Sequence, residues 1–457
     1  MQGNSLTGGN IVKSLLGFTG PFLLANFLQG LYSNVDALVV GNFSDSAEMA
    51  AVATGGTIMM TITNLVMGLT TGGTVLIAQY YGAEDYEDVN ESIGTMFTIF
   101  FAISIVLTGV LLLLAEPIVN VMQVPGEAEK AALSYTRICY IGLIFTMGYN
   151  IVSAMLRGMG DSKNPLIFIG IACVVNIILD LLLVAVFNMG AAGAAIATTL
   201  AQAVSFVISV IYLRLKDFSF DFKLHSFIPS GEKIRHLLRL GVPIGAQNLL
   251  ASASFMVIMA IINNMGVTAS AATGVGDKIS AITQMPAMAF SSAIAAFAAQ
   301  NMGASQPDRA LHGFKLGLIV TVAIGVIFSA AMAIFPGTLM DLYTNDDKVI
   351  DIAWQYMWPY AAETLLVSFA FSYSGFFNGC GKASVSMAAH LISTFAVRIP
   401  VAILLGSLEE ATLFHVTLSA PISSAVQTII LIIYMRTKKW RTGAVIDNAE
   451  TLNAFNS

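Results

Sequence analysis

The sequence predicts an all-α integral membrane protein with twelve transmembrane helices in two pseudo-symmetric six-helix bundles. The first observation is composition: the 457-residue chain is 56% hydrophobic and 11% charged, whereas soluble domains carry roughly 25% charged residues. The second is that apolar runs of about twenty residues recur from end to end, each long enough to cross ~30 Å of hydrocarbon as a helix. The third is an internal repeat, in which one unit of about 220 residues occurs twice.

Twelve apolar segments are expected to form the spans, six in each half of the chain. The first half contributes residues 12–41, 50–81, 92–115, 131–156, 164–187 and 190–213. The second half contributes residues 236–264, 270–300, 311–336, 350–377, 384–406 and 412–435. The first two segments of each half are longer than a bilayer requires, so we expect tilts or kinks there.

Short motifs carry the internal repeat in near-constant register. Residues 78–83 and 299–304 share the pattern Ala-Gln-x-x-Gly-Ala at an offset of 221 residues, and 157–160 and 378–381 share x-Gly-x-Gly at the same offset. In a chain this apolar, a duplicated half is typical of a transporter built from two structural repeats. We expect Gly82 and Gly303 to end the second and eighth spans at the cytoplasmic face through permissive backbone geometry.

The basic residues set the expected orientation in the membrane. With a cytoplasmic N-terminus, sixteen of the 21 Lys and Arg residues fall on the cytoplasmic side and three on the opposite side. Both termini are therefore expected in the cytoplasm, and the protein is expected in the cell (cytoplasmic) membrane. The net charge of −6 comes mostly from acidic residues in short loops, and no nucleic-acid partner is expected.

A polar, basic stretch divides the chain into its two halves. Residues 1–214 are expected to form the N-terminal six-helix lobe, 215–235 a cytoplasmic linker, 236–436 the C-terminal lobe and 437–457 a cytoplasmic tail. Because six spans return the chain to the side from which it started, the halves are expected to be parallel repeats about an axis along the membrane normal.

The chain shows no motif for catalysis or for a bound cofactor. It lacks a Walker A sequence, a nucleophile elbow and an HExxH motif, and its five histidines do not pair at ligand spacing. Its cysteines, Cys139, Cys173 and Cys380, lie in apolar contexts and are expected to be small buried hydrophobes. The sequence therefore predicts no enzyme, no catalytic residues and no cofactor.

The informative residues are the few polar ones inside the spans. Asp36 and Asp180 lie within the first and fifth spans, where ionisable groups are costly and usually mark a function. Asn176 and Asp180 are four residues apart and share a helix face, and Thr198 lies in a Gly/Ala-rich sixth span that permits close helix approach. These oxygens suit a hard cation such as Na⁺, whereas two neighbouring carboxylates would hold a proton. The alternative is a structural role, as helix caps or partners of buried backbone.

Among the other intramembrane polar residues, Asp277 and Lys278 are expected to have a structural role. Asp277 and Lys278 are adjacent, so they either neutralise each other or lie near a span end. Arg398 has no acid close to it in sequence, and Glu363 in the tenth span is a candidate partner. The amides at Gln29 and Asn150 suit contacts across helices or contacts with a substrate.

Taken together, these residues resemble the multidrug and toxic compound extrusion (MATE) family, in its DinF-like bacterial and archaeal branch. The resemblance covers nearly the whole chain, including the duplicated Gln-x-x-Gly-Ala at Gln79 and Gln300. The chain departs from the NorM branch, whose seventh helix carries a glutamate, because residues 252–257 contain no acid. The resemblance also rests on the pattern of Pro21, Gln29, Tyr32, Asp36, Asn150, Asn176, Asp180 and Thr198.

The resemblance implies a MATE fold and a secondary active antiporter that exports organic cations and drugs in exchange for H⁺ or Na⁺. It implies ion coupling at Asp36, Asn176, Asp180 and Thr198, and we expect this site to be confined to the first half, with no metal other than Na⁺. We expect the substrate cavity to involve Gln29, Tyr32, Asn150 and Glu363. A monomer in contact with membrane lipid is expected.

Two other functions remain as alternatives to drug efflux. A flippase for a lipid-linked precursor would need a more basic cavity, and the spans offer only Lys278 and Arg398. A membrane sensor or receptor would bind the same molecules without transporting them. Substrate-dependent efflux from loaded vesicles separates a transporter from a receptor, while the substrate and the choice between H⁺ and Na⁺ are left open by the sequence.

Overall fold

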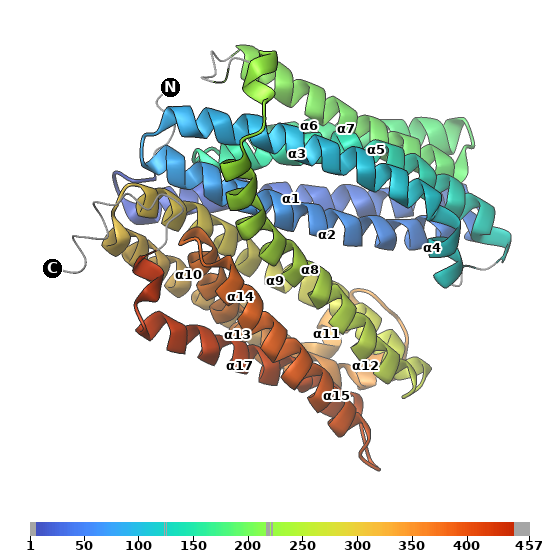
Figure 1. Ribbon diagram of the computed structural model, residues 1–457. Helices are drawn as coiled ribbons and strands as arrows, with labels where there is room; N and C mark the ends of the chain where they lie inside the picture. Colours follow the sequence, from blue (N-terminus) through green and yellow to red (C-terminus); the bar gives the residue numbers. More distant parts are fainter. Residues whose placement is uncertain (1–5, 123, 125, 216–219, 221–222, 443–457) are drawn as a thin grey trace. The chain divides into compact units, whose positions relative to one another are not determined.

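The protein is helical throughout the part of the chain that the structure describes. The computed structural model (Figure 1) describes residues 6–442 apart from 123, 125, 216–219 and 221–222, and apart from the side chains of Tyr32, Ser33 and Leu224. Every regular element within these residues is a helix, so the predicted all-α fold class is confirmed. The expected tail from 443 onward lies outside the described residues.

The first half contains the elements that correspond to the first six expected spans. In chain order these are α1 (Ile11–Phe43), α2 (Ser46–Gly82), α3 (Tyr86–Leu113), the short α4 (Ala115–Val121), α5 (Gly126–Gly158), α6 (Lys163–Asp180) with the π-helix η1 (Leu181–Val186), and α7 (Gly190–Leu215). A single turn of 3₁₀ helix, η2 (Leu224–Phe227), lies in the connection to the second half.

The second half repeats this order of elements. It contains α8 (Gly231–Asn263), α9 (Val267–Gly303), α10 (Pro307–Ile334), the short α11 (Pro336–Asp341) and α12 (Asp347–Asp351), and α13 (Ala353–Gly379). It continues with α14 (Ala383–Leu391), the π-helix η3 (Ile392–Arg398), α15 (Ile399–Gly406), α16 (Leu413–Thr417), α17 (Ser419–Arg436) and the 3₁₀ turn η4 (Lys439–Arg441).

Eleven helical segments of the described chain are long and apolar enough to cross a membrane. The remaining expected span, 350–377, corresponds to α13, which is 27 residues long. α13 is more polar because it carries buried residues such as Glu363 and Ser368. It packs against α9, α10 and α17, so these side chains face protein, where polar groups in a membrane are tolerated.

The helices reproduce the sequence repeat in length and in packing. α2 and α9 are both 37 residues long, and α3 and α10 are both 28 residues long. A Cβ atom added to Gly55 would lie 2.2 Å from the ring of Tyr135, and one added to Gly276 would lie 2.4 Å from the ring of Tyr356. The two glycine–tyrosine contacts are related by the same 221-residue offset, so the repeat extends to individual packing contacts.

The duplicated Gln-x-x-Gly-Ala segments end α2 and α9, but their glycines do not supply the expected backbone geometry. Gly82 and Gly303 are the last helical residues, and neither has a positive φ angle. The left-handed positions are Glu84 (φ 60°) and Ser305 (φ 56°), two residues further on. The expectation for the glycines was wrong in this detail. The backbone N–H groups of the residues after each glycine cap the end of the helix, so the glycine itself does not need a left-handed conformation.

The chain divides into two compact units whose limits differ from the expected lobes in two places. Unit 1 contains Gly20–Gly241, and unit 2 contains Leu6–Thr19 together with the chain from Val242. The start of the first expected lobe thus belongs to unit 2, and the start of α8 belongs to unit 1. Pro21 and Pro243 follow directly after the two changes of unit, at matching places in the repeat.

Specific contacts hold the start of α1 within unit 2. Leu15 and Phe18 pack in one hydrophobic cluster with Ala293 and Phe297 of α9. The backbone N–H of Leu6 donates to Gln300 Oε1 at 2.9 Å. These contacts explain why the segment before Gly20 belongs to unit 2.

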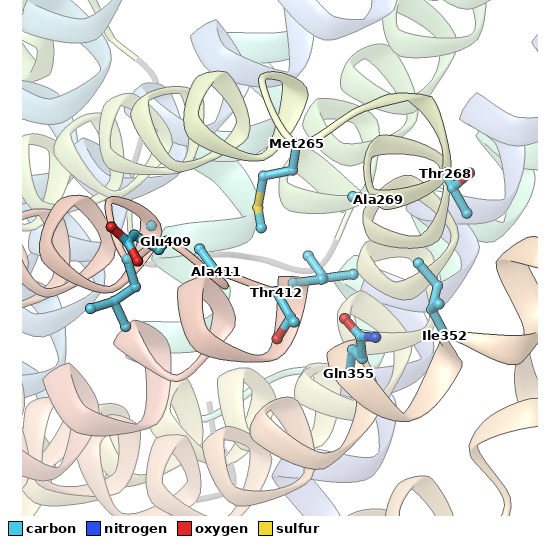
Figure 2. A pocket seen from close by; sticks show the side chains of 11 residues that line it. Met265, Thr268, Ala269, Ile352, Gln355, Glu409, Ala411 and Thr412 are labelled. Carbon is cyan, nitrogen blue, oxygen red and sulfur yellow. The ribbon is translucent and has the colours of Figure 1, made fainter.

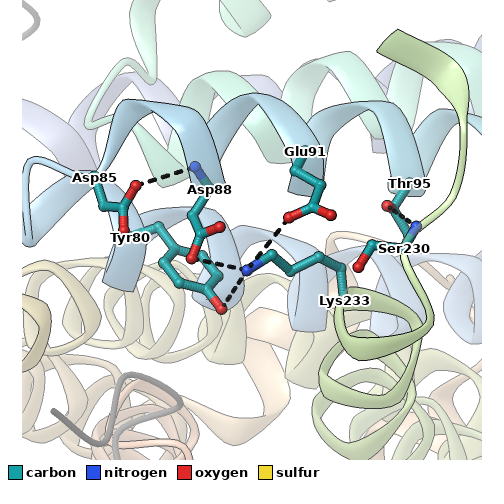
Figure 3. Close-up of polar contacts among 7 residues, drawn as sticks. All are labelled: Tyr80, Asp85, Asp88, Glu91, Thr95, Ser230 and Lys233. Atoms are coloured by element: carbon teal, nitrogen blue, oxygen red, sulfur yellow. Dashed lines mark hydrogen bonds and ion pairs between the residues drawn. The ribbon is translucent and has the colours of Figure 1, made fainter. Parts of the chain in front are cut away.

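The start of α8 is held within unit 1 by a buried lysine (Figure 3). Lys233, whose side chain is 3% exposed, lies 2.8 Å from Asp88 and 3.7 Å from Glu91. Its ammonium also donates to the Tyr80 hydroxyl at 2.8 Å. Eight residues later, Gly241 crosses α2 so closely that a Cβ on Gly72 would lie 2.4 Å from its Cα. The residues expected to end a linker therefore form an anchored helix start.

Candidate functional site

Three of the predicted site residues, Gln29, Tyr32 and Asp36, belong to α1. Gln29 and Asp36 are seven residues apart, which is about two turns of an α-helix. Asp36 lies inside the helix, which ends at Phe43. Gln29 is partly buried, and the side chain of Tyr32 lies outside the described residues.

Asp36 joins α1 to α6 and α7 within unit 1. The carboxyl is 3% exposed. Its Oδ1 accepts a hydrogen bond from Asn176 Nδ2 at 3.1 Å, and its Oδ2 accepts one from Thr198 Oγ1 at 2.7 Å. Asn176 Nδ2 also reaches Thr198 Oγ1 at 3.4 Å. Three of the four residues expected to couple ions are thus hydrogen-bonded to one another.

Asp180 completes this group. Its carboxyl lies beside that of Asp36, and the residue is fully buried. Neither Asp180 oxygen has a hydrogen-bond partner in the described part of the chain, and the same holds for Asn176 Oδ1. Asp180 is the last residue of α6, and the π-helix η1 follows directly. Short π segments in helices are frequent at functional sites.

The arrangement favours ion chemistry over helix capping. Asp180 makes no side-chain cap hydrogen bond to η1, and the hydrogen bonds of Asp36 come from the side chains of Asn176 and Thr198. Two buried carboxyls, an amide oxygen and a hydroxyl oxygen converge from three helices. Such a set of oxygens suits a hard cation, and two adjacent carboxyls equally suit a shared proton. We call Asp36, Asn176, Asp180 and Thr198 the N-terminal oxygen cluster.

Asn150 has its hydrogen bond within its own helix. The side chain is 4% exposed, and its Nδ2 donates to the carbonyl oxygen of Thr146 at 2.8 Å. Its amide hydrogen is therefore directed along α5, and no described hydrogen bond joins it to the N-terminal oxygen cluster. Its role in a substrate cavity stays a prediction.

Unit 2 holds a second group of buried polar residues. Tyr356 donates its hydroxyl to Asp277 Oδ1 at 2.5 Å and lies 3.3 Å from Ser280 Oγ. Ser424 Oγ donates to Glu363 Oε1 at 2.9 Å. These residues come from α9, α13 and α17. We call Asp277, Tyr356, Glu363 and Ser424, together with Arg398 at the end of η3, the C-terminal polar cluster.

The charges of this cluster are arranged differently from the sequence-based expectation. Lys278 is exposed, whereas the adjacent Asp277 is partly buried and bonded to Tyr356, so the two do not neutralise each other directly. Arg398 is the basic residue of this cluster, and Glu363 and Asp277 are its acidic residues. It forms no direct ion pair with either of them in the described chain.

A separate cavity of about 400 Å³ lies elsewhere in unit 2 (Figure 2). It lies between the turn that precedes α9, the start of α13 and the connection from α15 to α16. Glu409 is the one carboxylate among its lining residues. The cavity holds none of the predicted site residues; its lining includes Met265, Thr268, Ile352, Gln355, Glu409 and Thr412.

Comparison with protein families decides the identity of the chain. The family model described as MatE matches residues 21–182 and again residues 243–404. The chain belongs to the MatE family. The two matches begin at Pro21 and Pro243, the residues that follow the two changes of unit. Each half of the chain is therefore a MatE repeat, as the internal duplication predicted.

Relatives of this MatE protein match it over most of their length. The chain is 28% identical over 400 residues to "Probable multidrug resistance protein YpnP" of Bacillus subtilis (strain 168), covering 88% of this chain and 89% of that protein. It is 25% identical over 448 residues to "Probable multidrug resistance protein NorM" of Thermotoga maritima, covering 95% and 94%. The resemblance thus spans both units.

Solved structures of the MATE fold superpose on nearly the whole chain. A crystal structure of MATE in the bent conformation gives a TM-score of 0.90 at 22% identity, covering 96% of this chain and 97% of that chain. A MOP superfamily transporter from Pyrococcus furiosus gives a TM-score of 0.90 at 22% identity, covering 97% and 99%. The predicted MATE fold is confirmed.

The MatE repeat contains site residues that sequence reasoning missed. Tyr356 and Ser424 each donate to a carboxyl of unit 2, and Ser280 Oγ lies 3.3 Å from the Tyr356 hydroxyl. Serine and tyrosine are common in membrane helices, so their types alone carried no signal. Tyr356 was nevertheless detectable, because Tyr135 stands 221 residues before it and both pack against a glycine.

Proposed function

We propose that this MatE protein is a secondary active multidrug antiporter, which exports organic cations and other drugs in exchange for H⁺ or Na⁺. Membership of the family and the relatives described as probable multidrug resistance proteins support drug efflux. The observation that carries ion coupling is the N-terminal oxygen cluster, where both Asp180 oxygens are buried without a hydrogen-bond partner in the described chain. Buried carboxyls in a membrane protein usually serve ion movement.

The geometry suggests how the coupling ion is held. For Na⁺, the ligands are the carboxylates of Asp36 and Asp180 with the oxygens of Asn176 and Thr198. For H⁺, the two adjacent carboxyls share the proton, and Asn176 and Thr198 donate to the oxygens of Asp36. Either ion neutralises charge that is costly to bury. Binding of the ion therefore favours the conformation that encloses the N-terminal oxygen cluster. The drug and the ion compete because each shifts the same conformational equilibrium of the protein.

The proposal includes a place in the cell and a state of assembly. The positive-inside asymmetry of the sequence supports cytoplasmic termini and a position in the cytoplasmic membrane. We propose that it acts as a monomer surrounded by lipid, with the substrate cavity involving Gln29, Tyr32, Asn150 and Glu363. No cofactor is needed, because the ion gradient supplies the free energy.

Reconstitution under separately imposed gradients tests the function and its coupling ion. Purified protein is placed in proteoliposomes loaded with a fluorescent organic cation, and a pH gradient or a Na⁺ gradient is then applied. Efflux driven by one gradient, and dye-dependent flux of that ion in the opposite direction, is the expected result. Dye binding without efflux under either gradient would instead identify a receptor.

A further inference from the structure

The C-terminal polar cluster contains buried charges that the proposed ion site does not use. Glu363 lies ten residues inside α13 and is 6% exposed. Arg398 ends the π-helix η3, and Asp277 lies on α9. The first half has no counterpart, since the residues 221 positions before Glu363 and Arg398 are Gly142 and Ile177. The cluster is therefore a property of unit 2 and not part of the repeated scaffold.

The opposite charges of this cluster lie near each other without pairing. Arg398 forms no direct ion pair with Glu363 or Asp277 in the described residues, although η3, which ends at Arg398, and α13, which carries Glu363, both pack against α17. Glu363 Oε2 and Arg398 Nε are both buried, and neither has a hydrogen-bond partner among the described residues. A buried ion pair is stable only when its remaining polar atoms are hydrogen-bonded. This arrangement therefore leaves the carboxylate of Glu363 and the guanidinium of Arg398 each with an atom that can bind another partner.

Neighbouring groups hold the two charges in place. Ser424 donates to Glu363 Oε1 and leaves Oε2 as the carboxylate oxygen available to another partner. Arg398 is bounded by the π-helix η3 on one side and by Pro400 in the first turn of α15 on the other. Tyr356 and Tyr360 stack at 4.1 Å between ring centroids with an angle of 11° between planes. This pair is a rigid aromatic element one to two turns from Glu363 on the same helix.

Building on the proposed transport function, we propose that Glu363 and Arg398 form a two-charge binding site for a zwitterionic substrate, a molecule with one cationic group and one carboxylate. The cationic group pairs with Glu363 Oε2. The carboxylate pairs with the planar guanidinium of Arg398, whose forked N–H groups match carboxylate geometry. A substrate with only a positive charge gains the contact with Glu363 but is repelled by Arg398. Arg398 thereby determines the preference for zwitterions over cations.

Two dyes that differ in one functional group test this preference. Rhodamine B carries a cationic xanthene and a free carboxylate, and rhodamine B ethyl ester carries the same cation with the carboxylate blocked. Binding of each dye to purified protein in detergent is measured by fluorescence anisotropy without any ion gradient. We expect Arg398→Gln to weaken rhodamine B binding by roughly tenfold or more, because a charge-assisted hydrogen bond is lost. The same change should strengthen binding of the ester.

Glu363→Gln should weaken both dyes, because both use the carboxylate. Lys278→Gln is the matched control: it removes one positive charge from the same unit at an exposed position and should change neither dye. Equal effects of Arg398→Gln on the two dyes, or no effect on either, would show that Arg398 has only a structural role and would overturn the proposal.

A conservative variant and the choice of readout keep the test decisive. If Arg398→Gln does not fold, Arg398→Lys keeps the charge and loses the fork, and it should weaken rhodamine B without strengthening the ester. An unchanged preference in Arg398→Lys together with unchanged binding of both dyes to Glu363→Gln would refute the site. The proposed antiport is judged separately by gradient-driven efflux, so a failure of transport with intact dye discrimination would count against antiport alone.

Discussion

Asp36 receives a hydrogen bond at each carboxyl oxygen and lies beside a second carboxyl. We predict that Asp36→Asn abolishes gradient-driven efflux, to the level of protein-free vesicles, while the protein remains folded. An amide has nearly the same shape but cannot take up a proton, and it is a poorer cation ligand. Efflux from proteoliposomes is the measurement, with the thermal unfolding midpoint as the check on folding.

The matched control for this variant is Glu116→Gln, which makes the same acid-to-amide change at an exposed residue paired with Arg137. It should leave efflux unchanged. Wild-type efflux by well-folded Asp36→Asn protein would show that Asp36 does not couple transport to the ion.

Variants of Thr198 and Asp180 test whether α7 and α6 contribute to the same ion site as Asp36. Thr198→Val removes the donor 2.7 Å from Asp36, and Asp180→Asn removes the second carboxylate. We predict that either change raises the concentration of coupling ion needed for half-maximal efflux by roughly ten- to a hundredfold, since a hydrogen bond to a charged group is worth ~1.5–3 kcal/mol. Titrating efflux against pH and against Na⁺ measures this shift.

The comparison variant is Glu363→Gln, which should affect substrate binding and not ion dependence. Loss of ion dependence in Glu363→Gln, with none in Asp180→Asn, would place the coupling site in unit 2 and contradict the assignment made here.

The sequence was informative about single residues where a polar type stood in an apolar run. Asp36, Asn176, Asp180 and Thr198 were selected in this way, and the structure brings them together. Ser280 and Ser424 escaped notice because a serine is unremarkable in such helices. The separation of Arg398 from Glu363 was also not predictable, since it depends on the path of η3 and on the hydrogen bond from Ser424.

Close helix contacts at single glycines define the packing of individual elements. A Cβ on Gly276 would lie 2.4 Å from the Tyr356 ring, whereas one on Gly274 would meet no atom within 4 Å. We predict that Gly276→Ala destabilises the protein by about 1–3 kcal/mol, the usual cost of overpacking, and that Gly274→Ala does not. Thermal or denaturant unfolding of the purified variants in detergent measures the difference.

The repeat provides an independent copy of this experiment. Gly55 packs against Tyr135 in unit 1, and its neighbour Gly56 has no atom within 4 Å of an added Cβ. Gly55→Ala should therefore be destabilising and Gly56→Ala neutral, by the same mechanism. Equal stabilities within both pairs would show that these tyrosines move aside without cost.

Helix existence was easier to predict than helix ends. Apolar run length located the spans, because crossing hydrocarbon requires about twenty apolar residues. The start of α8 was placed five residues too late, at 236 instead of Gly231, because the turn before it is polar. That turn is helical since Lys233 is buried against Tyr80 and Asp88, a tertiary contact that no local pattern reveals.

The orientation of the whole molecule is open to direct test by labelling. Single cysteines at Ala83→Cys and Ala304→Cys, in a background without the three natural cysteines, are probed with a membrane-impermeant maleimide. Both positions should react only from the cytoplasmic side, because each lies at the cytoplasmic end of a span in the expected topology. Reaction of either position from outside alone would reverse the predicted topology.

For the whole molecule, the duplication in the sequence predicted more than composition did. Matching helix lengths, glycine–tyrosine contacts and left-handed residues recur at an offset of 221 in the structure. The assignment of the chain to units was less predictable. Leu6–Thr19 belongs to unit 2, and nothing in its own composition distinguishes it from the first half that follows.

This placement of Leu6–Thr19 has a consequence for biosynthesis. Gln300, which bonds to Leu6, is translated 294 residues after it. At about 5–20 residues per second, the ribosome reaches these partners roughly 15–60 s after the segment emerges. Leu6–Thr19 therefore waits for partners from the second repeat, whereas Gly20–Gly241 finds its partners within unit 1. A chain truncated after its first repeat inserts α1 with the initial turns of that helix permanently without partners.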